Sequence, residues 1–187
     1  MSRVWVSGYR SYELGIFQND DPKLKIIKQA LSDQLSQLIE SGCDWIITGG
    51  QLGIEQWTVE VAKELQQKYP HEFQLAVMLP FKKFGSNWNE DNQAKLHQAI
   101  TKSDFSDSVS NHPYDSPKQL KNYQRFMLTH TDQALLVYDP ENEGKTKYDY
   151  QAIQQFQQNH AYPLQLIDFD QLQDIADDYE RNLNDDF

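Results

Sequence analysis

Short apolar runs alternate with longer amphipathic segments along the whole chain. Six runs have the length and apolar content of buried strands: 4–7, 45–48, 73–79, 104–109, 134–138 and 163–167. The run at 104–109 is the least regular of them. Between the runs, apolar residues recur at the spacing of three or four that is typical of helices. This alternation predicts an α/β protein, a three-layer sandwich of helices around a mostly parallel sheet.

Local signals mark where several of the helices begin and end. Asp21 followed by Pro22 is typical of a helix start, and Gly42 stands where a glycine would end that helix. In the same way, Ser116 followed by Pro117 predicts a helix that begins near 117. Further helices are expected over about 52–69, around 94–100, over 148–158 and around 172–179.

The composition indicates one domain and a reducing compartment. With 187 residues, of which 39% are hydrophobic, we expect a single domain over 1–187 with a frayed tail at 182–187. No apolar run approaches the roughly 20 residues that cross a bilayer, and the N-terminus lacks the apolar region of a signal peptide. Because the single Cys43 cannot form an internal disulfide, we expect a cytoplasmic protein with an unreactive, half-buried thiol.

The charge of the chain limits its classes of partner. A formal net charge of -11 disfavours binding to nucleic acid or to an anionic membrane, because such binding needs clustered Lys and Arg. A small anionic ligand held by backbone amides is compatible with this charge. The five histidines are scattered without the spacing of metal ligands, so no metal site is expected.

Three loops that follow strands should meet at one edge of the sheet, because the carboxyl ends of parallel strands share an edge. They follow the runs at 4–7, 45–48 and 134–138. Their candidate ligand-binding residues are Gly8, Arg10, Thr48, Gly49, Gly50, Gln51, Gly53, Glu55, Asp139, Gly144 and Thr146.

The glycine turn 49–53 is a candidate phosphate site. Its glycines would let backbone N–H groups approach a ligand, and the following helix would add partial positive charge. The turn lacks the complete G-x-G-x-x-G spacing and the ending of a P-loop. A tight strand–helix connection without a ligand explains it equally well, and Thr48 either donates to a phosphate or caps the strand.

Glu55 and Arg10 each have two interpretations. In the first turn of a helix, Glu55 would stabilise the helix dipole. In a pocket it would repel phosphate but accept hydrogen bonds from ribose, or activate water for attack at a sugar carbon, which makes it the catalytic candidate for an enzyme. Arg10 could hold a phosphate with both arms of its guanidinium, or form a surface ion pair with Glu13.

Two further groups could contact a ligand. Lys145 and Lys147 could reach a phosphate, although exposed lysines are ordinary at a helix start. Phe81, Phe84 and Trp88 could stack on a base, or pack a long loop onto the domain.

Several motifs of the chain resemble the YpsA family of Gram-positive bacteria. These motifs are Gly8-Tyr9-Arg10, Glu13 to Phe17, Thr48 to Trp57, His112 to Pro117 and Tyr138 to Gly144. The match covers nearly the whole length. The YpsA family belongs to the SLOG superfamily of Rossmann-like proteins, which are similar to the cytokinin-activating LOG enzymes and to the DNA-processing protein DprA.

The resemblance implies a cytoplasmic, Rossmann-like protein that senses or processes a nucleotide-like ligand, such as NAD or ADP-ribose. It also implies a link to cell division and the stress response, with cell-division proteins as partners. It places the ligand site at Gly53 and Glu55. LOG enzymes carry Gly-Gly-x-Gly-Thr-x-x-Glu where residues 143–148 read Glu-Gly-Lys-Thr-Lys-Tyr, and many SLOG relatives carry Arg-Asn where Tyr123-Gln124 stands. Both departures argue against LOG-like hydrolysis.

Three hypotheses follow from the sequence. The first is a nucleotide-binding sensor or regulator. The second is an enzyme that acts on the N-glycosidic bond of a nucleotide through Glu55. The third is an interaction protein of the division machinery with a vestigial pocket.

Overall fold

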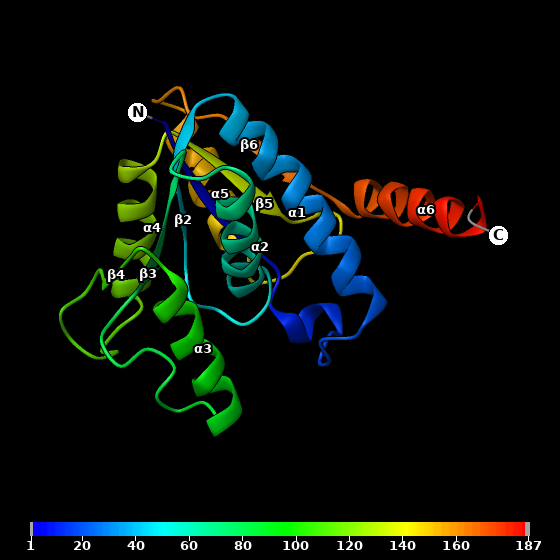
Figure 1. Ribbon diagram of the computed structural model, residues 1–187. Coiled ribbons are helices and arrows are strands. Elements are labelled where there is room, and N and C mark those ends of the chain that lie inside the picture. The colour runs from blue at the N-terminus through cyan, green and yellow to red at the C-terminus, as the bar shows by residue number, and fades with distance from the viewer. Residues whose placement is uncertain (1, 186–187) are drawn as a thin grey trace.

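The computed structural model describes residues 2–185, which form a six-stranded parallel sheet with helices on both faces (Figure 1). The strands are β1 (Ser2–Gly8), β2 (Cys43–Thr48), β3 (Gln74–Leu79), β4 (Phe105–Ser108), β5 (Gln133–Val137) and β6 (Leu164–Ile167). Their order across the sheet is β4-β3-β2-β1-β5-β6, and all neighbouring strands are parallel. The expected Rossmann-like α/β sandwich is confirmed.

The helices form two layers, one on each face of the sheet. They are the 3-10 helix η1 (Ser11–Leu14), α1 (Pro22–Glu40), α2 (Ile54–Lys68), α3 (Glu90–Lys102), α4 (Lys118–His130), α5 (Lys147–Gln157) and α6 (Phe169–Asp185). Helix α1 packs against α2 and α6, and α2 packs against α3, whereas α4 packs against α5 and β1. Figure 1 shows α1, α2 and α3 in front of the sheet.

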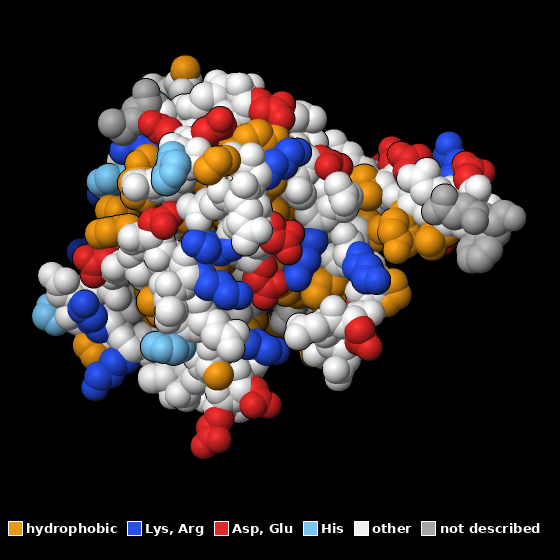
Figure 2. All heavy atoms as spheres, viewed as in Figure 1, with side chains coloured by type: hydrophobic (Ala, Val, Ile, Leu, Met, Phe, Trp, Pro, Cys, Tyr) orange, Lys and Arg blue, Asp and Glu red, His pale blue; other side chains and the backbone are white. Residues whose placement is uncertain are grey.

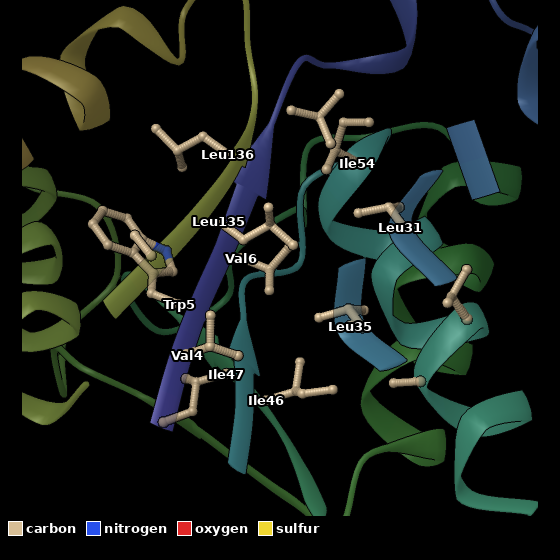
Figure 3. Close-up of a cluster of buried hydrophobic side chains, with 14 of the residues drawn as sticks. Val4, Trp5, Val6, Leu31, Leu35, Ile46, Ile47, Ile54, Leu135 and Leu136 are labelled. Carbon is tan, nitrogen blue, oxygen red and sulfur yellow. The ribbon is translucent and has the colours of Figure 1, made fainter. Parts of the chain in front are cut away.

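The alternation of side chains along β1 divides them between the two layers. In Figure 3, Val6 and Ile46 extend toward Leu35 and Ile54 of the α1–α2 layer, while Trp5 lies on the other side of the sheet. All five side chains are buried. Burial of side chains of this size contributes about 1.5–3 kcal/mol each, which fixes the strand register and thereby the loops at the strand ends.

Two helices begin slightly later than the sequence signals suggest. Helix α2 begins at Ile54 because Gly53, with a φ of 112°, still belongs to the preceding turn. Helix α4 begins at Lys118, one residue later than expected. There the side chain of Gln119 accepts a hydrogen bond from the N–H of Ser116 at 3.1 Å, which closes the turn before the helix.

Helix α6 extends away from the body of the fold (Figure 1) and carries hydrophobic side chains along one side (Figure 2). It stays helical through Asp185, and the rest of the tail that the sequence predicts to fray, residues 186–187, lies outside the described residues. Within residues 2–185, no helix is long and apolar enough to cross a membrane. The same residues contain no cluster of three or more His, Cys, Asp or Glu side chains that could hold a metal ion.

The direction of strand addition reverses between β1 and β5. From β1 the chain adds β2, β3 and β4 toward one edge, and then returns to place β5 on the other side of β1. Because the connections on the two sides of this point cross opposite faces of the sheet, the loops after β1 and β5 diverge and leave a crevice. Open parallel sheets bind ligands at such a position.

Candidate functional site

A cleft of about 1040 Å³ opens at the carboxyl edge of the sheet, at the point where the strand order reverses. The segments that follow β3, β2, β1 and β5 line it, and α4 covers it from one face. This volume lies at the upper end of the range for small-molecule sites, about 300–1,000 Å³.

The loop after β1 and the glycine turn after β2 form a single paired structure. Arg10 and Gly53 form an antiparallel bridge. The N–H of Ser11 donates to the carbonyl of Leu52 at 3.1 Å, and the N–H of Ile54 donates to the carbonyl of Tyr9 at 3.1 Å. This pairing holds the start of α2 against the end of β1, so the side chains of Arg10 and Glu55 are brought together although they lie 45 residues apart.

Glu55 is the buried acid of the cleft floor. Its side chain is 7% exposed, and its Oε2 lies 3.4 Å from Nη1 of Arg10, whose side chain is 15% exposed. The carboxylate reaches back over the glycine turn, where Oε1 accepts a long hydrogen bond of 3.5 Å from the N–H of Gln51. A Cβ on Gly49 would overlap this carboxylate and would lie 2.6 Å from the Tyr123 hydroxyl, so only glycine fits beneath Glu55.

Asp149 is a second acid at the same floor. The hydroxyl of Ser7, at the end of β1, lies 3.4 Å from Oε2 of Glu55 and 3.3 Å from Oδ2 of Asp149, within reach of both acceptors. The side-chain amide of Gln124 on α4 donates to Oδ1 of Asp149 at 2.8 Å. Side chains from β1, α2, α4 and α5 therefore converge on one polar cluster.

The cluster has two carboxyl groups, those of Glu55 and Asp149, but one guanidinium, that of Arg10. Burial raises the pKa of Glu55 above its ordinary value, the Arg10 guanidinium opposes this rise, and Asp149 adds to it. Burial also raises the pKa of Asp149, against the hydrogen bond from Gln124 and the charge of Arg10. Burial and the two carboxyls keep the pKa of Tyr123 well above its ordinary value, so its hydroxyl stays protonated. Two carboxyls facing one guanidinium favour retention of a proton within the pair.

The walls of the cleft differ in character from its floor. On the β3 side, Phe84 and Trp88 line the cleft and pack edge to face, with ring centroids 5.2 Å apart. On the other sides, Lys121 of α4 and the lysines Lys145 and Lys147 near the start of α5 line it. The cleft therefore combines an aromatic wall, an acidic floor with one arginine, and a rim with three lysines.

Comparison with known proteins places the chain in a family. The model of the YspA SLOG family, named YpsA, matches residues 4–172. The chain belongs to the YpsA family. All the cleft residues named above lie within the matched range, so the cleft is part of the YpsA domain rather than of an added segment.

Several relatives are similar to the chain over nearly its whole length. The UPF0398 protein of Lactiplantibacillus plantarum is 57% identical over 187 residues, which cover 100% of this chain and 98% of that protein. The UPF0398 protein of Levilactobacillus brevis is 56% identical over 184 residues, 98% of this chain and 97% of that protein. The UPF0398 protein of Leuconostoc citreum is 53% identical over 188 residues, 100% of this chain and 99% of that protein.

In this YpsA-family chain, part of the sequence-predicted site lines the cleft. The predicted residues that do so are Arg10, Gly50, Gln51, Glu55 and Gly144. The predicted residues that do not line it are Gly8, Thr48, Gly49, Gly53, Asp139 and Thr146.

Three of the residues that do not line the cleft have structural roles. The buried hydroxyl of Thr48 donates to the carbonyl of Val6 at 2.7 Å, so this residue caps the strand. Gly8 has no room for a side chain, because a Cβ would lie 2.7 Å from the carbonyl oxygen of Val137. The carboxyl of Asp139 accepts from the N–H of Glu141 at 2.9 Å and so closes its own loop.

The side chains of Arg10 and Glu13 do not form a surface ion pair with each other. The guanidinium of Arg10 pairs with Glu55, whereas the carboxylate of Glu13 accepts from the N–H of Arg10 at 2.7 Å and from the N–H of Lys145 at 2.9 Å. Glu13 thereby joins the loops after β1 and β5. Nearby, the hydroxyl of Thr146 is fully buried and has no hydrogen-bond partner among the described residues.

Four residues of the cluster are absent from the sequence-predicted ligand site: Ser7, Tyr123, Gln124 and Asp149. For Asp149 a signal exists in the sequence. Thr146 and Asp149 reproduce the Thr-x-x-acid end of the LOG motif, with the shorter Asp in place of Glu. Tyr123 and Gln124 stand where many SLOG relatives carry Arg-Asn, which marks their position in the sequence but not their role. Ser7 carries no such signal, because a serine at a strand end is an ordinary residue there.

Proposed function

We propose that this YpsA-family protein binds a nucleotide-like ligand in the cleft and acts as a sensor of that ligand. The observation that carries the proposal is the floor, where Arg10 faces the carboxyls of Glu55 and Asp149 at the reversal point of the sheet. Carboxyl groups accept hydrogen bonds from sugar hydroxyls, and a guanidinium pairs with phosphate oxygens. A phosphorylated ribose carries both kinds of group.

The phosphate is better placed beside the lysines than on the glycine turn. The Glu55 carboxylate lies against that turn and engages the N–H of Gln51, so a phosphate there would meet a negative charge. Lys121, Lys145 and Lys147 line the cleft. A phosphate on their side of the floor gains ionic hydrogen bonds and avoids the carboxylate.

The aromatic wall suits the base of the same ligand. Phe84 and Trp88 line the cleft at the β3 end. In the order of the strands, the glycine turn after β2 lies between them and Arg10. Aromatic side chains stack on bases with little regard to base identity, a contact worth about 1–3 kcal/mol per base. NAD and ADP-ribose, the ligands that the family resemblance suggests, combine a base, ribose and phosphates and therefore match the three kinds of wall.

Catalysis at the N-glycosidic bond is the second candidate function, and the raised pKa values of the two carboxyls favour it. A pair in which one carboxyl is ionised and the other protonated can divide acid and base roles. Glu55 in its ionised form would take a proton from the water that attacks the sugar carbon. Asp149 in its protonated form would give its proton to the departing base.

One experiment separates the two functions. The protein is incubated with AMP, ADP-ribose or NAD, and thermal unfolding and reaction products are followed in the same samples. A ligand at a hundred times its Kd adds about 2.7 kcal/mol, or about 5–10 °C in Tm for a domain of this size. A Tm increase without release of base supports the sensor, and release of adenine or nicotinamide supports the enzyme.

A matched pair of variants makes the test specific for the floor. Glu55→Gln keeps the size of the side chain but removes its charge, and we expect it to lose most of the ligand-induced Tm increase. Glu64→Gln, an exposed position on the same helix, should keep it. If none of the three ligands raises the Tm of the wild-type protein, the proposal of a nucleotide site is wrong.

A sensor must bind a partner differently with and without its ligand. The family resemblance suggests cell-division proteins as the class of partner. A pull-down of a purified division protein with and without ADP-ribose tests this part. Ligand-dependent capture by the wild type and by Glu64→Gln, lost in Glu55→Gln, is the expected result. Capture that is independent of both ligand and Glu55 would instead favour a vestigial pocket.

A further inference from the structure

The cleft is longer than a single nucleotide site requires. It reaches from the segment after β3, across β2 and β1, to the segment after β5, which are four neighbouring strands. Because parallel strands lie about 4.8 Å apart, its two ends are separated by about 14 Å. The aromatic wall of Phe84 and Trp88 occupies only the β3 end.

A second pair of aromatic side chains lines the opposite end. Tyr12, in the loop after β1, and Tyr148, at the start of α5, both line the cleft. They are 53% and 59% exposed, so neither contributes much to the core. Exposed aromatic rings at the wall of a cleft have a free face on which a planar group can stack.

Each of these tyrosines is accompanied by a lysine. The Nζ of Lys145 lies 5.8 Å from the ring centroid of Tyr12, and the Nζ of Lys147 lies 5.3 Å from that of Tyr148. Lysine beside an aromatic ring provides a stacking surface and a phosphate ligand at the same place. In the order of the loops along the sheet edge, Arg10 and Glu55 lie between this end and the aromatic wall.

We propose that Tyr12 and Tyr148 form a second base subsite, so that the cleft binds two nucleosides joined through phosphates. This inference rests on the proposed nucleotide site and names its ligand class. One base stacks at Phe84 and Trp88, the linked riboses cross the floor, and the other base stacks at Tyr148. The phosphates lie beside Lys121, Lys145 and Lys147, away from the Glu55 carboxylate. A mononucleotide fills only half of the cleft.

Three ligands that differ by one part each test the second subsite by calorimetry. Diadenosine diphosphate has two adenines, ADP-ribose keeps both riboses and both phosphates but has one adenine, and AMP has one nucleoside. We expect diadenosine diphosphate to bind the wild type roughly tenfold more tightly than ADP-ribose, the scale of one stacked base. Tyr148→Ala should reduce this ratio to less than about threefold and leave the affinity for AMP within about twofold.

Two further variants test whether a loss of affinity comes from the missing aromatic ring rather than from a disturbed fold. Tyr148→Phe retains the ring and should retain the tenfold ratio, whereas Phe84→Ala should weaken AMP itself. Because Tyr148 is exposed, its substitution is expected to leave the fold intact, which the unchanged AMP affinity verifies. If ADP-ribose binds and diadenosine diphosphate binds no more tightly, the second subsite is wrong while the nucleotide site stands. If none of the three binds, the proposed function itself fails.

Discussion

The Nη1 atom of Arg10 lies 3.4 Å from Oε2 of Glu55 across the floor of the cleft. The two residues come from the loop after β1 and from the first turn of α2, and the backbone bridge between Arg10 and Gly53 holds those segments together. Asp149 shares the hydroxyl of Ser7 with Glu55. The Arg10 guanidinium lowers the pKa of both carboxyls, against the effect of burial. Because these carboxyls are buried and share one guanidinium, we expect the stability of the protein to depend on pH through them.

The raised pKa of Glu55 predicts that its charge costs stability. A carboxyl whose pKa is higher in the folded than in the unfolded state stabilises the fold below its unfolded pKa of about 4.3, and that contribution is lost as pH rises through the folded pKa. Glu55→Gln does not titrate, so at pH 8 its free energy of unfolding should exceed that of the wild type by about 0.5–2 kcal/mol, and its Tm should be higher. The difference in stability between Glu55→Gln and the wild type should decrease toward pH 4.

Thermal unfolding from pH 4 to pH 8 checks this dependence, with Glu64→Gln as the control on the exposed face of the same helix. A Glu55→Gln variant that is destabilised equally at every pH would show that the carboxylate is a net stabilising partner of Arg10.

Gly53 should tolerate alanine much less well than Gly15 does. Both have positive φ angles, 112° and 64°. At Gly53 a Cβ would lie 2.5 Å from the Tyr9 carbonyl oxygen, whereas at Gly15 the nearest atom is the Lys23 Nζ at 3.7 Å. We expect Gly15→Ala to cost about 1 kcal/mol and Gly53→Ala about 3 kcal/mol or more. Urea unfolding measures both, and equal losses would mean that the bridge to Arg10 is unimportant for stability.

Asp149 should discriminate ribose from deoxyribose. If its carboxyl accepts a sugar hydroxyl, the wild type binds AMP about tenfold more tightly than 2′-deoxy-AMP, the scale of a hydrogen bond to a charged group. Asp149→Asn should reduce this preference to about twofold. Asp132→Asn, which lies at the opposite edge of the sheet beside Arg3, is the matched control. An unchanged preference in Asp149→Asn would remove Asp149 from the ribose site.

The lysines near the start of α5 should increase the affinity for the ligand by contacting its phosphates. The double variant Lys145→Ala/Lys147→Ala is expected to bind ADP-ribose about tenfold more weakly at low salt and adenosine unchanged. Because both side chains are at least partly exposed, the difference should narrow at high salt. Lys25→Ala, an exposed position on α1, serves as the control in the same titrations. Equal loss of ADP-ribose and adenosine binding would point to a structural effect.

Cys43 should react with thiol reagents only after unfolding. The residue is buried, and burial raises the pKa of its thiol to about 11, so almost none of it is thiolate at neutral pH. The rate of labelling by an aromatic disulfide reagent, with and without denaturant, measures this protection. Rapid labelling of the native protein at pH 7 would contradict the burial of β2 at this end.

The elements of the fold were largely predictable because each is specified locally. The continuous apolar run before Tyr138 identified β5, and the periodic apolar residues before Gly42 identified α1. The boundaries at Ile54 and Lys118 shifted by one or two residues, since they depend on a glycine conformation and on a side-chain hydrogen bond that spacing does not specify. β4 has a poor apolar period because it is an edge strand whose side chains are exposed or half-buried.

The candidate site was predictable only in part. Loop positions at the strand ends led to Arg10, Gln51 and Glu55, because in a parallel sheet the carboxyl edge follows from the order of the elements alone. Thr48 has the same sequence context, yet its hydroxyl bonds to the neighbouring strand instead of facing the cleft. Tyr123 enters the cleft from α4, and the face that a helix turns toward a cleft depends on how it packs.

The sequence by itself determined the alternation of strands and helices, the family, and the presence of an acid in the first turn of α2. Those features follow from side-chain periodicity and from short motifs within one segment. Only the tertiary structure decided that Glu55, Asp149 and Ser7 share one buried place with a single arginine. That arrangement arises from the packing of β1 between β2 and β5, which joins segments far apart along the chain and removes them together from water.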